Sequence, residues 1–164
     1  MGSEMCIRDS SYIYPQTEED YSIAYINDFE GECEIKRKGE EIPEVIRDIY
    51  LPLYAGDTVI TEEGSYAEIV FDDATIVKLD PCSKLIIRDL TREKKIKTII
   101  ELIKGKILAV VKKLREKEEF SVKTKLAMAA VKGTEFIVEV DEDERIGVFD
   151  GRVEVVNYDM KGEE

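Results

Sequence analysis

Carboxylates are the commonest side chains able to do chemistry in this chain of 164 residues, which has 37 Asp and Glu residues and no histidine. The lack of histidine removes the usual general base and the commonest metal ligand. Asp72-Asp73 and the acidic run 141–144 fall where we predict turns, and turns favour such residues. Calcium could bind carboxylates at either place, but neither has the spacing of an EF-hand loop. We therefore predict no catalytic residue, no metal site, no cofactor and no enzymatic activity.

The step Lys132-Gly133-Thr134 is the closest match to a phosphate-binding motif, but its residue order argues against that role. A phosphate loop needs a Gly-rich run before Gly-Lys-Thr and a helix after it, and we predict neither here. We predict instead that Gly133 permits a bend and that Thr134 hydrogen-bonds locally before a strand resumes at Phe136. The same interpretation, as turn or bulge positions, applies to Gly56-Asp57, Gly105 and Gly151.

The three cysteines cannot all pair with one another, and without histidine they make a poor zinc site. Cys33 alternates with Ile35 on a face that we predict to be buried, where a thiol acts as a small hydrophobic group. Cys82 follows Pro81 near a predicted turn. A Cys33–Cys82 disulfide is an alternative in an oxidising compartment, provided that their Cα atoms lie within about 7 Å.

The formal net charge of −13 argues against DNA or RNA as a partner, because a polyanion would be repelled. The basic cluster at 92–97 is short, and we interpret it as a solvated loop and strand start. A surface rich in Glu and Lys is common in heat-adapted proteins, so a thermophilic source is a hypothesis. No stretch is long and apolar enough to predict a transmembrane segment.

The stretch 120–157 predicts three or four β-strands separated by turns. Phe136, Val138 and Val140 alternate with residues of the opposite face, which is the period of a half-buried strand. After the acidic turn, the same alternation continues on either side of Asp150-Gly151. The apolar positions that continue it are Ile146, Val148, Val153 and Val155. The pattern predicts an all-β scaffold.

The segment 95–116 supports two interpretations. Its apolar residues recur at helical spacing, and a helix over this whole range is one reading. Gly105 at its centre and the many β-branched residues favour two strands separated at the glycine. We predict strands as far as Val111, with a short helix as an option over 112–119.

Several segments, taken in order, resemble the FecR domain, a family named after the regulator of iron-dicitrate uptake. The strongest is the C-terminal pair Ala130–Phe136 and Val148–Val155, with an acidic turn between them. The others are Gly31–Ile35, Leu53–Thr61, Ala67–Thr75 and Leu102–Ile107. Three positions depart from the family pattern. Ala74 stands where a hairpin glycine is usual, Lys125 replaces a proline, and Lys132 replaces an arginine. The Ala74 turn must therefore avoid a positive φ or be strained.

The resemblance implies a single β domain over 29–158, either a β-solenoid-like stack or a flattened sandwich. It also implies an extracytoplasmic place, in the periplasm or at the cell surface, as in FecR-type anti-sigma regulators. The family-motif residues would then be structural. They are Gly31, Gly56, Asp57, Gly105, Gly133, Thr134, Phe136 and Gly151.

Three further segments lie outside this domain. Residues 1–10 resemble a cloning remnant followed by a translated adapter of the kind seen in metagenomic reading frames. The tyrosine-rich segment 11–28 is an N-terminal arm, either docked on the domain or a linker, and 159–164 is a tail.

Two functions fit these features. The first is a non-catalytic module for protein interaction or signal sensing, which binds a partner's strand at an exposed sheet edge. The alternative is a structural subunit of a cell-surface layer or filament, in which the chain associates with itself and the arm packs on a neighbouring copy.

Overall fold

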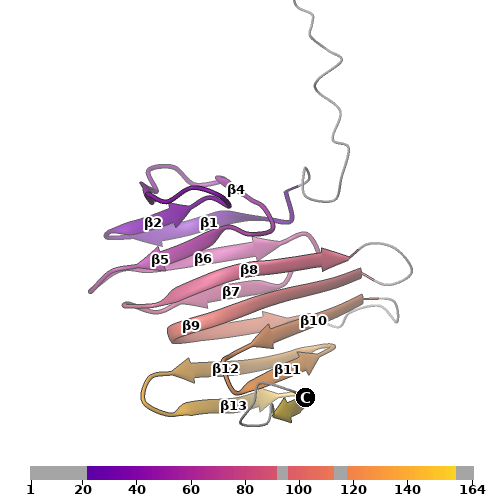
Figure 1. Cartoon of the computed structure of the whole chain (residues 1–164). Helices are drawn as coiled ribbons and strands as arrows, with labels where there is room; N and C mark the ends of the chain where they lie inside the picture. The colour runs from indigo at the N-terminus through magenta and orange to yellow at the C-terminus, as the bar shows by residue number, and fades with distance from the viewer. Residues whose placement is uncertain (1–21, 92–95, 113–117, 158–164) are drawn as a thin grey trace, which may run out of the picture.

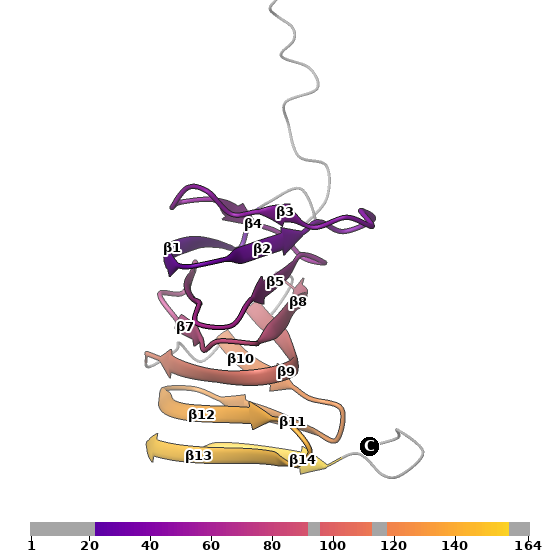
Figure 2. The same cartoon turned by 90° about the vertical axis from the view of Figure 1, so that its left-hand side faces the viewer.

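The computed structural model describes residues 22–91, 96–112 and 118–157, and these residues form fourteen strands and no helix (Figure 1). The expected artefact at 1–10, most of the arm, most of the basic cluster at 92–97 and the tail at 159–164 lie outside them. The all-β prediction is confirmed. The strands run as layers from the N-terminal end to the C-terminal end, with β13 and β14 as the last layer (Figure 2).

The strands form two half-sheets that share one long strand, β9 (Ile96–Val111). Sheet I has the order β4 (Pro52–Leu53), β1 (Ala24–Glu30), β6 (Tyr66–Phe71), β7 (Ile76–Leu79), β9, β12 (Thr134–Val140) and β13 (Glu144–Asp150). Sheet II has the order β3 (Glu44–Val45), β2 (Cys33–Lys36), β5 (Thr58–Thr61), β8 (Lys84–Thr91), β9, β10 (Glu118–Lys123), β11 (Ala127–Val131) and β14 (Val153–Asn157).

One hydrophobic core holds side chains from both halves. Alternate residues of most strands point into it, as the period of a strand requires. In β12, Phe136, Val138 and Val140 are buried while Glu135 is exposed, which confirms the alternation expected there. Phe120 of sheet II meets Phe71 of sheet I edge to face, with ring centroids 5.4 Å apart, so the contact ties the halves together.

Within the ambiguous segment 95–116, residues 96–111 form one strand, so the helix interpretation is wrong for the residues that the structure describes. Thr98, Ile100 and Leu102 are buried in sheet II, and Ile107, Ala109 and Val111 are buried in sheet I. The buried positions change from even to odd numbers at Gly105, which has a φ of 94°. Ile99, Ile103 and Val110 on the outer face are also apolar, and together with the buried residues they give the spacing of three and four that imitates a helix.

The optional helix over 112–119 is not formed where the structure describes that range. Glu118 and Glu119 begin β10, which pairs in parallel with β9, and Lys112 follows the end of β9. Residues 113–117 lie outside the described residues.

The expected boundary between arm and domain falls too late in the chain. β1 begins at Ala24 and pairs with β6, so the last five residues of the expected arm belong to the sheet. Ala24 and Ile26 are buried, whereas Tyr25 and Asn27 are only partly covered. This strand was not predicted from the sequence, because only every second residue of a strand faces the core and the residues between them are polar here.

Both described cysteines are free, so the Cys33–Cys82 disulfide is not formed. Cys33 is buried, as its alternation with Ile35 indicated, and its Sγ lies 3.2 Å from the carbonyl oxygen of Tyr66. Burial raises the pKa of its thiol to about 11, so it stays protonated at neutral pH. Cys82 is exposed in the turn between β7 and β8, with a φ of 58°.

The turn between β6 and β7 adopts the strained alternative, because Ala74 has a φ of 68°. The Asp73 carboxylate accepts a hydrogen bond of 2.9 Å from the backbone N–H of Thr75, which holds the turn locally. A positive φ costs an L-residue roughly 1–2 kcal/mol, part of which glycine recovers.

Ala74→Gly is therefore expected to raise the free energy of unfolding by about 1 kcal/mol in urea titrations. Ala55→Gly is the control, because Ala55 is not among the described residues with positive φ. Its replacement should lower stability by about 0.5–1 kcal/mol through backbone entropy alone. A loss of stability in Ala74→Gly would contradict the strain at this turn.

Candidate binding site at the C-terminal end of the stack

The family-motif residues lie at separate turns along the stack. Gly31 and Gly105 each sit against a serine from a neighbouring turn, Ser65 and Ser83 respectively. A Cβ on Gly31 would lie 2.9 Å from the Cβ of Ser65, and one on Gly105 would lie 2.5 Å from the Cα of Ser83. These contacts are tighter than a side chain allows, so the two glycines permit close packing between layers.

Asp57 is the one charged motif residue, and its carboxylate is buried in a network that holds three loops together. Its Oδ2 accepts 2.6 Å and 2.9 Å bonds from Arg37 Nη1 and the backbone N–H of Tyr54. Arg37 Nη1 also donates to the carbonyl oxygen of Pro52, at 2.9 Å. Gly56, with a φ of 94°, precedes it and donates to Ile87 O. Because each oxygen has a structural partner, this carboxylate stabilises the fold.

Only Gly133, Thr134 and Gly151 come together, at the last corner of the stack. Thr134 Oγ1 donates a 2.7 Å hydrogen bond to the carbonyl oxygen of Arg152. Gly151 has a φ of 95°, and a Cβ there would lie 2.6 Å from Gly133 O. Phe136, the remaining motif residue, is fully buried. Gly133 and Thr134 also line a cavity of about 470 Å³ at this corner, where the Thr134 hydroxyl is already bonded to the carbonyl oxygen of Arg152.

The C-terminal end of the stack is open. β13 pairs only with β12, and β14 pairs only with β11. Val148 lies opposite Phe136 and Val155 lies opposite Ala129, so both valines face the core side of their half-sheets. They are nevertheless 46% and 45% exposed, because no further strand among the described residues covers them. Sequence reasoning found the alternation of these residues but could not show that they are uncovered.

The N-terminal end is closed by contrast. Its edge strands, β3 and β4, have only two residues each. Ile46 and Leu53 are buried there, at 3% and 0% exposure. Short edge strands and a covered core are the usual protection against pairing with another chain.

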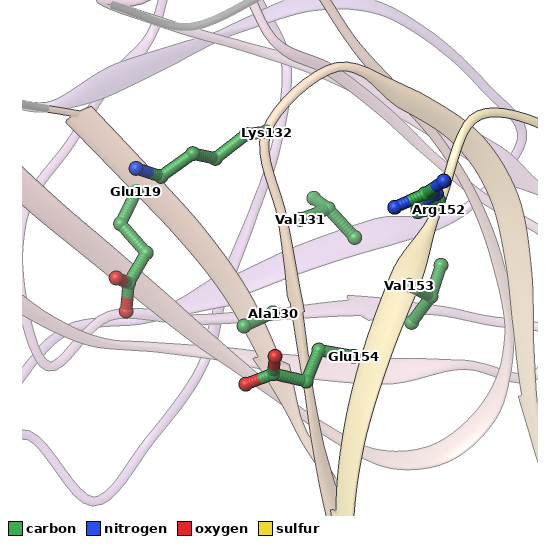
Figure 3. Close-up of a pocket in the computed structure, with 7 residues that line it drawn as sticks. All are labelled: Glu119, Ala130, Val131, Lys132, Arg152, Val153 and Glu154. Atoms are coloured by element: carbon green, nitrogen blue, oxygen red, sulfur yellow. The ribbon is translucent and has the colours of Figure 1, made fainter. Parts of the chain in front are cut away.

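A cavity of about 450 Å³ lies beside β14 (Figure 3). It is lined by Glu119, Ala130, Val131, Lys132, Arg152, Val153 and Glu154. Ala130 pairs directly with Glu154, and Figure 3 shows its short side chain beside the Glu154 carboxylate. The lining has charged groups of both signs but no hydroxyl, thiol or imidazole, so it is suited to ion pairing and apolar contact.

The described residues contain no group of three or more His, Cys, Asp or Glu side chains that could hold a metal ion. Among those same residues, no helix is long and apolar enough to cross a membrane.

The fold is that of an all-β stack in which glycine-containing turns join two half-sheets. The family model described as FecR protein matches residues 57–154, which is more than half of the chain. The chain therefore belongs to the FecR family. The match covers the corners at Asp57, Gly105, Gly133 and Gly151.

Two solved structures of a protein from Parabacteroides distasonis, described provisionally as an anti-sigma factor, share the fold. Their resolutions are 1.65 Å and 2.50 Å, and each is similar to this chain at 23% identity with a TM-score of 0.54. The similarity covers 62% of this chain and 48% and 47% of the two solved chains, so this chain spans about half their length. A comparison with curated proteins found no match.

Proposed function

We propose that this chain is the signal-sensing module of a FecR-type regulator, that it works outside the cytoplasm, and that it acts by binding a protein partner without catalysis. The observation that carries the proposal is the open C-terminal end, where two edge strands and a half-exposed apolar core lie together. Such an edge binds protein by strand addition. Family membership supports the regulatory role, and so does the provisional description of the structural neighbour.

The chemistry of the described surface supports binding over catalysis. The cavity beside β14 is lined by alanine, valine and four charged side chains, with no hydroxyl, thiol or imidazole. The buried carboxylate of Asp57 is used by Arg37 and by the backbone of Tyr54. A catalytic site needs an activated group within reach of a substrate, and these residues do not provide one.

The open end also favours a second function, that of a structural subunit of a surface layer or filament. Unpaired edges of two copies could join and extend the sheet. Sedimentation of the chain before and after removal of residues 1–21 separates the two functions. We expect a monomer in both cases. Self-association that disappears with the segment would support the structural subunit.

The regulatory role predicts a particular organisation of the native gene. We expect the gene that encodes this domain to encode also a membrane-spanning segment and a cytoplasmic helical region. Alkaline phosphatase fused after Asn157 of that full-length gene should be active, because the enzyme works only outside the cytoplasm. β-Galactosidase fused at the same position is the matched control and should be inactive.

The opposite fusion pattern would exclude the extracytoplasmic role. A cleavable leader or a lipid-attachment cysteine in place of the membrane-spanning segment would make the structural subunit the better proposal.

A further inference from the structure

We propose that β14 accepts a basic, extended segment of another protein as an added strand, and that this strand covers the open end of the core. The inference rests on the proposed function and names its edge and the chemistry of its partner. Three features carry it: the regularity of β14, the exposed core-facing valines, and the acidic surroundings.

β14 is the only one of the four described edges that lacks the usual protection against strand addition. β3 and β4 are only two residues long, and β4 contains Pro52, which has no N–H to donate to a neighbouring strand. β13 contains Gly147 and faces an irregularity in register at Glu135 and Phe136. β14 instead has five residues in unbroken register with β11, with no glycine, proline or lysine.

The valines of β14 determine which side chains the added strand needs on its core-facing side. Val153 and Val155 lie opposite Val131 and Ala129, which are buried, so they point to the core side of sheet II. Val153 packs against the core, while Val155 remains 45% exposed. An added strand places every second side chain on this same face. Aliphatic residues at those positions would cover Val155 and remove apolar surface from water.

The net charge of the last layer favours a basic partner, while Lys132 and Arg152 line the cavity beside Glu154 together with Glu119. Residues 141–157 carry six carboxylates and two arginines. Arg145 is already bound to Asp141 and Glu139, at 2.7 Å and 3.0 Å. Glu154 is exposed on the outer face of β14, and it forms no ion pair with another described residue. Lys or Arg on the outer face of the added strand would meet Glu154 directly.

The same charges disfavour a second copy of this chain as the occupant. Each copy carries a net charge of −13, so two copies repel each other on approach. A basic segment is attracted instead, which raises its association rate and makes its affinity depend on salt.

The test uses a synthetic peptide of nine residues in which valine and lysine alternate, added to the isotope-labelled chain. Amide hydrogen exchange followed by NMR should slow along Val153–Asn157 and stay unchanged along β3. The dissociation constant should rise with salt. The control is a peptide of the same sequence with alternate amides N-methylated, which keeps the charge but cannot pair as a strand, and it should not bind.

Glu154→Lys is the matched protein variant, because it reverses the charge on the edge and leaves the core-facing valines in place. We expect binding about tenfold weaker and an unchanged melting temperature. Val45→Lys on β3, where the valine is 52% exposed, should leave binding unchanged.

Four results would overturn the proposal. These are no protection at millimolar peptide, protection of β13 or β3 in place of β14, equal binding of the N-methylated peptide, and unaltered binding by Glu154→Lys. A dimer formed through β14, detected by sedimentation, would also contradict the proposal, because a second copy of this chain would then occupy the β14 edge. None of these results changes the outcome of the phosphatase fusion, so the extracytoplasmic role is tested independently of binding at β14.

Discussion

Gly105→Ala is expected to lower the free energy of unfolding by about 3–4 kcal/mol, the sum of backbone strain and overlap. Gly105 has a φ of 94°, a conformation that costs an L-residue roughly 1–2 kcal/mol. Its added Cβ would also lie 2.5 Å from the Cα of Ser83, and a backbone atom cannot rotate away. Chemical denaturation followed by circular dichroism measures the loss.

Gly39→Ala separates the two costs. Gly39 has a similar φ of 82°, but a Cβ there would meet nothing within 4 Å. Its replacement should cost only the backbone strain, about 1 kcal/mol. The difference between the two variants reports the contact between Gly105 and Ser83. Equal losses would show that the close approach of these two turns contributes nothing to stability.

The Ser83 side chain also holds the bend at Gly105 through a hydrogen bond. Its Oγ accepts a 3.0 Å hydrogen bond from the backbone N–H of Lys106, directly after the glycine. The bend of β9 at Gly105 is therefore held by one close backbone approach and one hydroxyl. Removing the hydroxyl alone, in Ser83→Ala, would not make room for a Cβ, because the Cα of Ser83 stays in place.

Asp57→Ala is expected to cost about 3 kcal/mol of stability. The carboxylate side chain is only 3% exposed and forms a 2.6 Å ion pair with Arg37. Removing one partner of a buried pair costs roughly 3–5 kcal/mol, and we take the lower end because the Arg37 side chain is 26% exposed and can be hydrated. The backbone N–H of Tyr54 also loses its acceptor. Urea titration is the measurement.

Two control variants show how much of the stability lost in Asp57→Ala comes from its buried charge. Asp57→Asn keeps an oxygen for the Tyr54 N–H but removes the charge, so its loss should be intermediate. Asp143→Ala removes an 84% exposed carboxylate that lies 3.9 Å from Arg145, and it should change stability by less than about 0.5 kcal/mol. A loss below about 1 kcal/mol in Asp57→Ala would mean that water replaces the network at this corner.

Prediction from the sequence succeeded where local pattern and burial coincide. Alternation along β12 identified the buried faces of Phe136, Val138 and Val140, and the glycines at 31, 56, 105, 133 and 151 all have positive φ. It failed in β1, where polar outer residues hid the strand that starts at Ala24. It left two interpretations of β9, because apolar residues on both faces of that strand together imitate a helical repeat.

The candidate site was predictable only in part. The alternation of Ile146, Val148, Val153 and Val155 indicated two strands, and strand addition at a sheet edge was expected without a named edge. That β14 is an edge depends on its single pairing with β11, which lies more than twenty residues earlier in the chain. The cavity joins Glu119 of β10 to Glu154 of β14, and no spacing along the sequence indicates that contact.

The sequence by itself determined the all-β class, the positions of the turns and the acidic charge. Each of these depends on composition or on residues close together in the chain. Only the tertiary structure decided that β9 serves both half-sheets and that the N-terminal end is closed. It also decided that β14 stays open with Val155 half exposed. The reason is physical: pairing and closure depend on register between distant strands, and a local alternation of apolar residues is compatible with many registers.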